Sequence, residues 1–146
     1  MAKSWWIIVY KFIPKGVGDY DEAIHDFRVT TVQENLENIN YVYRAIRKNV
    51  ENAAVIFTLS PVPLKATFRD IGCIPANSIS KAILRVALDE LVNKYPEDNQ
   101  LHYFPSYELI IDSLPHPFGP DRRYITSDTI NFVMSLFANH YVVHEA

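Results

Sequence analysis

The sequence predicts a single α/β domain, residues 1–146, with three layers and a mostly parallel sheet. Residues 55–59 are apolar, aromatic or β-branched without polar alternation, which indicates a strand covered on both faces. Helical patterns precede and follow this strand, and such alternation is typical of α/β proteins. Pro61 and Pro63 end the strand abruptly, because proline has no N–H to pair.

Composition excludes several classes of function. Of the 146 residues 49% are hydrophobic, which is enough for a core, and a net charge of −3 provides no basic surface for nucleic acid. A single cysteine, Cys73, excludes an internal disulfide and a multi-cysteine zinc site, and is interpreted as a small apolar side chain in a loop. The apolar run 5–10 is too short for a signal peptide or a membrane helix. We therefore expect a soluble, cytoplasmic protein without a membrane or nucleic-acid partner.

The amino-terminal half predicts a βαβ unit. Residues 5–12, with the sequence WWIIVYKF, form the first expected strand, and residues 19–28 a surface loop. Thr31 and Glu34 have the spacing of a capping box and begin a helix with one apolar face that runs to about residue 48. The strand 55–59 completes the unit, whose crossover should be right-handed.

The carboxy-terminal half repeats the alternation. A loop at residues 65–76 leads to a helix capped by Asn77 or Ser78 and ending near residue 93. Residues 102–104 predict a third strand, residues 112–124 predict irregular structure, and Thr126 should cap a last helix. The apolar side chains expected on one side of that helix are Ile130, Val133, Met134 and Phe137. Three strands make a thin sheet, so the domain is expected to be incomplete on its amino-terminal side.

Candidate binding residues follow the strand ends, where ligands of open α/β sheets lie. Ser60 can bind substrate or initiate a turn, and Asn77 can donate to a substrate oxygen or cap the second helix. Ser80 and Lys81 do not face each other on a helix, which argues against a Ser-Lys dyad. Lys81 is instead expected to pair with a carboxylate, Glu108 or Asp70, or to bind an anion.

Tyr107 and Glu108 should lie beside the Ser60 loop if the second and third strands are neighbours. Glu108 can act in acid–base chemistry or hydroxyl binding, or can be paired with an arginine. His116 is the histidine nearest to Asp121 in the irregular loop. No histidine pair stands at ligand spacing with a carboxylate, so neither a metal site nor a cofactor is expected.

Three ordered blocks carry a resemblance to a known family: FTLSPVPL, ANSISKAILRVALDEL and YFPSYELIID. They resemble the carboxy-terminal part of the GSCFA family, which belongs among the SGNH/GDSL-like hydrolases. The resemblance implies a flavodoxin-like α/β fold. It also implies serine-based hydrolysis or transfer of an ester, such as an acyl group on a bacterial surface polysaccharide. Asp121 matches the catalytic acid of the family.

Two departures from the family pattern bear on activity. The Gly-Ser-Cys-Phe-Ala motif that supplies the nucleophile is absent, since no glycine here is followed by serine. Tyr124 stands where members of the family often carry histidine, and a tyrosine with a pKa near 10 is a poor general base. Some relatives share this variant. The nucleophile would come from upstream sequence, so this chain alone is expected to be inactive.

Two functional hypotheses follow. The first is an SGNH-type hydrolase acting on a small-molecule or carbohydrate ester, completed by a complementary amino-terminal segment. The second is a non-catalytic binding or assembly module that keeps the cleft and uses the sheet edge at residues 5–12 to pair with a partner or with a second copy of itself.

Overall fold

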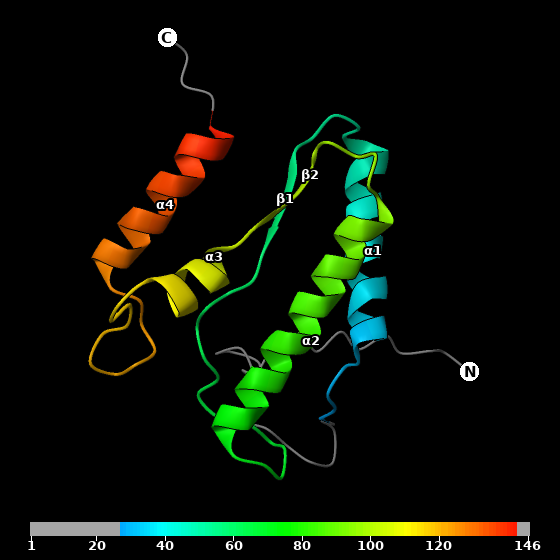
Figure 1. Cartoon of the computed structure of the whole chain (residues 1–146). Coiled ribbons are helices and arrows are strands. Elements are labelled where there is room, and N and C mark those ends of the chain that lie inside the picture. Colours follow the sequence, from blue (N-terminus) through cyan, green and yellow to red (C-terminus); the bar gives the residue numbers. More distant parts are fainter. Residues whose placement is uncertain (1–26, 143–146) are drawn as a thin grey trace, which may run out of the picture.

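The computed structural model describes residues 27–142 and confirms the α/β class (Figure 1). The predicted strand 5–12 lies outside these residues. The described elements are, in order, α1 (Val32–Asn49), β1 (Val55–Thr58), α2 (Cys73–Lys94), β2 (Leu101–Phe104), the short α3 (Ser106–Glu108), the π-helical segment η1 (Leu109–Ser113) and α4 (Ser127–Tyr141).

The two described strands are parallel neighbours. Val55 pairs with Leu101 and Thr58 with Phe104, so both strands end at the same edge of the sheet. The segments that follow them, which begin with Leu59 and Pro105, therefore leave the sheet side by side. This meets the condition under which the Ser60 loop and Glu108 were predicted to be close.

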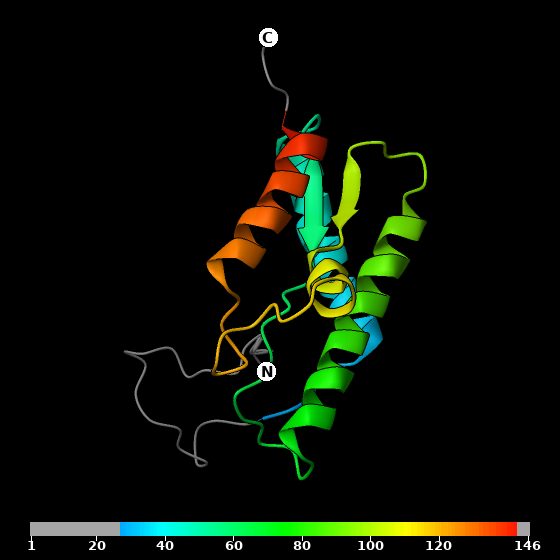
Figure 2. The ribbon, with the colours of Figure 1, turned by 60° about the vertical axis from the view of Figure 1, so that its left-hand side comes forward.

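Apolar side chains alternate between the two faces of this small sheet, as the pleat requires. Val55, Phe57 and Leu101 pack with α1 and α2 around the fully buried Leu91. Ile56 and Phe104 pack in a second cluster with η1 and α4. Figure 1 shows α4 on one side of the strands and α1 and α2 on the other, and Figure 2 shows the two strands side by side. The described sheet has two strands, and the larger flavodoxin-like arrangement stays a prediction.

Two of the three predicted helix starts are confirmed. The hydroxyl of Thr31 accepts from the backbone N–H of Glu34 at 3.1 Å, and the Glu34 carboxylate accepts from the backbone N–H of Thr31 at 2.8 Å. These reciprocal bonds form the predicted capping box. The hydroxyl of Thr126 accepts from the backbone N–H of Thr129 at 3.3 Å and caps α4.

The predicted start of α2 is wrong. The helix begins at Cys73, one residue after Gly72, so neither Asn77 nor Ser78 is its cap. Pro75 falls within the first turn, where a residue without an N–H breaks no helical hydrogen bond. That proline therefore belongs to the helix, and Asn77 lies inside α2 with its side chain free to bind elsewhere.

Smaller differences concern the carboxy-terminal third. Strand β2 starts one residue earlier than predicted, at Leu101, and residues 112–113 belong to η1. Of the apolar face predicted for α4, Val133 is buried and Phe137 packs beside it, whereas Ile130 and Met134 are 47% and 53% exposed. Within residues 27–142 no helix is long and apolar enough to cross a lipid bilayer.

Candidate functional site

The ends of β1 and β2 are joined by two hydroxyl groups. Thr58 Oγ1 donates to the backbone oxygen of Phe104 at 2.8 Å, and Ser106 Oγ donates to that of Leu59 at 3.1 Å. The two hydroxyls also lie 2.6 Å from each other. The two hydroxyl groups have one proton each, whereas there are three contacts. When both protons are donated to the backbone oxygens, neither is left for a bond between the hydroxyls, so that bond forms only if one of the bonds to a backbone oxygen is broken. Ser106 is therefore engaged in holding the strand ends together.

A polar stripe on α2 holds the loop that follows β1. We call Cys73, Asn77, Lys81 and Arg85 the α2 stripe, because residues four apart lie on one face of a helix. Cys73 Sγ donates to the backbone oxygen of Leu64 at 3.2 Å, and Asn77 Oδ1 accepts from the backbone N–H of Leu64 at 2.9 Å. Figure 1 shows the chain that leaves β1 running beside α2. The loop is fixed at its far end by these two side chains.

Lys81 fixes the near end of the same loop. Its Nζ donates to the backbone oxygen of Ser60, and its side chain is buried, with 9% exposure. Burial lowers the pKa of Lys81, because desolvation disfavours the charged amine. Among the described residues no carboxylate lies within ion-pair distance of it. The predicted pairing with Glu108 or Asp70 is therefore not formed within residues 27–142.

Glu108 is instead bound by Arg85 and Tyr103. Arg85 Nε lies 2.8 Å from Oε1 of Glu108, and the hydroxyl of Tyr103 donates to Oε2 at 2.9 Å. The guanidinium of Arg85 also stacks over the Tyr103 ring, 4.4 Å from its centroid. Burial, and then the hydrogen bond to Glu108, raise the pKa of Tyr103. This is the arginine pairing that was one of the two predictions for Glu108.

The remaining predicted residues lie around this cluster with different degrees of engagement. Ser60 is exposed, and its Oγ accepts from the backbone N–H of Val62 at 3.3 Å, which is the turn that Ser-Pro predicted. Tyr107 is half-buried in α3, and within residues 27–142 its hydroxyl makes no hydrogen bond. The structure thus places Ser60 and Glu108 just after the two strands, with Lys81 bound to the Ser60 carbonyl and Asn77 at the far end of the loop.

Asp121 stabilises the loop in which it lies through hydrogen bonds to the backbone. Its Oδ1 accepts from the backbone N–H groups of Arg123 and Tyr124, both at 3.1 Å, and these bonds lower the pKa of the Asp121 carboxyl. The Tyr124 side chain is 71% exposed. No hydrogen bond connects Asp121 to a histidine or a serine in the described part of the chain.

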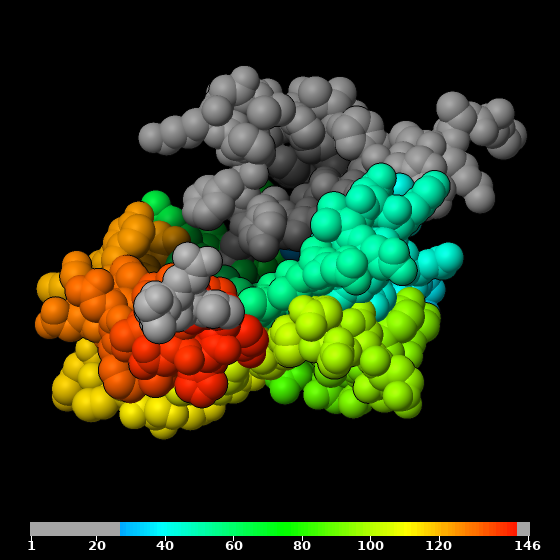
Figure 3. Space-filling model, turned by 90° about the horizontal axis from the view of Figure 1, so that it is seen from above, coloured from blue at the N-terminus to red at the C-terminus, as the bar shows by residue number. Residues whose placement is uncertain are grey.

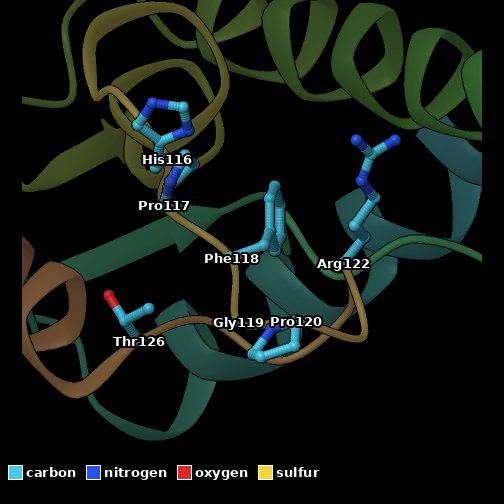
Figure 4. Close-up of a pocket in the computed structure, with 7 residues that line it drawn as sticks. All are labelled: His116, Pro117, Phe118, Gly119, Pro120, Arg122 and Thr126. Atoms are coloured by element: carbon cyan, nitrogen blue, oxygen red, sulfur yellow. The ribbon is translucent and has the colours of Figure 1, made fainter.

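The Asp121 loop also borders a hollow of about 650 Å³ lined by residues from His116 to Thr126. Figure 4 shows Phe118 and Arg122 projecting from the loop to the same side. His116 and Arg122 have positive φ angles of 51° and 53°. Residues 27–142 contain no group of three histidine, cysteine or acidic residues able to hold a metal ion.

Sequence reasoning missed Cys73, Arg85, Thr58 and Ser106. Cys73 was assigned to a loop, although it begins α2 and donates to the Leu64 carbonyl. The spacing of four residues from Cys73 to Arg85 was the available signal, and it went unused because the helix was expected to start later. The roles of Thr58 and Ser106 depend on the pairing of two strands, which has no local signal.

Replacing Asn77 with alanine is expected to lower the free energy of unfolding by about 1–2 kcal/mol, because the half-buried N–H of Leu64 loses its acceptor. Urea denaturation followed by circular dichroism measures this change. Ser78→Ala, on the exposed side of the same helix, is the control and should stay within about 0.5 kcal/mol of the parent. Equal effects of the two substitutions would contradict the role given to Asn77.

Comparison with known proteins gives one match. The model of the GSCFA family matches residues 6–137. No curated protein and no solved structure matches the chain.

Proposed function

Because the chain belongs to the GSCFA family, we propose that it supplies the strand-end half of an SGNH-type ester site. The serine nucleophile would come from a Gly-Ser block that this sequence does not contain. The proposed substrate is a small or carbohydrate ester, on which the complete site performs hydrolysis or acyl transfer. The proposed fold is the three-layer, flavodoxin-like arrangement of these enzymes, and apolar clusters on both faces of the β1–β2 sheet support it.

The observation that carries the proposal is the way α2 fixes the loop after β1. Asn77 and Lys81 hold the backbone of residues 60–64 at the C-terminal edge of a parallel sheet. Ligands of open α/β sheets bind at this edge, and a loop held rigidly there is suited to orienting a substrate. Ser60 is exposed on this loop, and its hydroxyl proton has no acceptor within residues 27–142.

The same geometry argues that residues 27–142 do not complete a catalytic serine by themselves. Ser106 is engaged with Leu59 and Thr58, and no histidine hydrogen-bonds a serine in the described range. Tyr124, which occupies the position of the family's histidine, is exposed. These facts also favour the second candidate, a non-catalytic binding or assembly module that keeps the α/β cleft.

Hydrolysis of p-nitrophenyl acetate tests the proposal. The purified full chain is expected to be inactive, as are Ser60→Ala, Ser80→Ala and Ser106→Ala. Activity is expected after mixing or fusion with an amino-terminal segment that carries the Gly-Ser-Cys-Phe-Ala motif of a family member. Mutation of the serine in that added segment should abolish it.

Two outcomes would overturn the proposed half-site. Hydrolysis by the chain alone, lost in one of its serine variants, would locate the nucleophile within this sequence. Failure of the complemented chain to hydrolyse the ester, together with a stable dimer of the chain alone by light scattering, would favour the assembly module.

A further inference from the structure

The cation of Lys81 lacks a neutralising partner in the described part of the chain. Its one described hydrogen bond goes to the backbone oxygen of Ser60, which uses one of three ammonium protons. Buried charges in proteins are usually paired, because desolvation without a partner costs several kcal/mol. A site that holds such a cation is therefore suited to receive an anion.

The surrounding charges favour an anion with a single negative charge. Arg85, the next residue of the α2 stripe, is neutralised by Glu108 at 2.8 Å and lies 3.3 Å from Asp89. Lys81 thus contributes the one described positive charge at the end of β1 that no described carboxylate neutralises. One ammonium matches a monoanion better than a dianion, because the second charge of a dianion would find no unpaired described cation at this strand end.

Ser60 provides both access and a second donor. Lys81 binds the backbone oxygen of Ser60. The hydroxyl proton of the same serine has no acceptor in the described structure, so the bond from Lys81 brings the two donors together although they come from α2 and from the loop after β1. Ser60 is exposed while Lys81 is buried. An anion that enters from solvent would meet the hydroxyl first and the ammonium behind it.

We propose that Lys81 and the hydroxyl of Ser60 bind a small carboxylate at the C-terminal end of β1. The ammonium contributes charge and two further N–H donors, and the serine contributes one O–H donor to the carboxylate oxygens. Ester hydrolysis releases such a carboxylate, and the identification of this ligand as the acid product rests on the function proposed above. Binding itself requires no nucleophile and no turnover.

Sodium acetate is the probe, titrated into the full chain labelled with ¹³C at the lysine ε-carbon. The Lys81 resonance, assigned by its loss in Lys81→Gln, is expected to shift saturably with acetate and not with sodium chloride at equal ionic strength. Inorganic phosphate should bind more weakly. Ser60→Ala should weaken acetate binding by about two- to tenfold, which corresponds to one lost hydrogen bond.

Two controls separate binding from folding. Lys81→Gln keeps a donor for the Ser60 carbonyl but not the charge, and circular dichroism establishes that it is folded. Ser60→Ala keeps Lys81 in place, so the inference is tested even if the glutamine variant does not fold. Ser78→Ala, on the exposed side of α2, should bind acetate like the parent.

An equal response to chloride would overturn the inference, as would an acetate affinity that Ser60→Ala leaves unchanged. Its failure is distinguishable from failure of the proposed function. Acetate binding at Lys81 in a complemented chain that hydrolyses no ester would leave the binding site standing and remove the ester function. Hydrolysis by the complemented chain without acetate binding at Lys81 would support the ester function and remove the binding site.

Discussion

Replacing Leu91 with alanine is expected to lower the free energy of unfolding by about 2–5 kcal/mol. Leu91 has 0% exposure and packs between both strands and α1, in contact with the cluster that contains Tyr43, Val55 and Leu101. The loss combines the transfer free energy of the deleted atoms with the cost of the remaining cavity, because a packed site relaxes only in part. Urea denaturation at pH 7, followed by circular dichroism, gives the value.

Ile74→Ala is the matched control for Leu91. Ile74 lies on the same helix but is 85% exposed, so its truncation should change the free energy of unfolding by less than about 0.5 kcal/mol. If Leu91→Ala and Ile74→Ala proved equally mild, the cluster between the sheet and the pair α1 and α2 would not be the main core.

The second large effect on stability is expected at Asp98. The carboxylate lies in the connection between α2 and β2, and accepts from Arg47 Nε at 2.7 Å, from the Tyr43 hydroxyl and from the backbone N–H of Gln100 at 2.9 Å. Figure 3 shows this connection beside the C-terminal part of α1. Asp98 therefore joins the end of α1 to the start of β2. Its side chain is 20% exposed and that of Arg47 18%.

The bond to Arg47, followed by that to Tyr43, lowers the pKa of Asp98 from 3.8 to about 2. Folding thus favours the carboxylate form of Asp98. Its contribution to the free energy of unfolding is fully present above the pKa that the group has in the unfolded chain. This contribution should be lost as pH falls from about 5 to about 2, and its size is on the order of 2 kcal/mol. Asp98→Asn should remove a similar amount at pH 7 and flatten the pH dependence of stability in that window.

Asp89→Asn is the control for the Asp98 experiment. Asp89 pairs with Arg85 at 3.3 Å, but its side chain is 58% exposed, and exposed ion pairs contribute about 0–1 kcal/mol. Urea denaturation of the parent and both variants at several pH values compares them. A parent and an Asp98→Asn variant with parallel pH profiles would show that the carboxylate is not stabilised by folding.

The strand-end cluster explains why residue identity alone gave an incomplete picture of the site. Ser60 and Glu108 were expected just after the strand ends, and each lies in the segment that follows a strand. The partners of Asn77 and Lys81 differ from expectation. Asn77 binds the backbone N–H of Leu64 and does not cap a helix. This bond fixes the position of the loop, and the amide nitrogen of Asn77 has no hydrogen-bond partner among residues 27–142.

The features that the sequence alone determined are local ones. They are the capping box of Thr31 and Glu34, the cap at Thr126 and the strand before Pro61. Each depends on residues a few positions apart, whose interactions form together with the helix or strand itself. The order of helices and strands follows from them. The family resemblance also belongs to the sequence, because its blocks are contiguous strings.

Only the tertiary structure decided which groups neutralise one another. Glu108 pairs with Arg85, 23 residues away, and within residues 27–142 the amine of Lys81 binds only a backbone carbonyl. Burial decided that Val133 faces the core while Met134 does not. These outcomes depend on how α2 and α4 pack against the β1–β2 sheet. Desolvation and ion pairing are set by the groups that surround a side chain in the folded protein, and most of these groups are distant in the sequence.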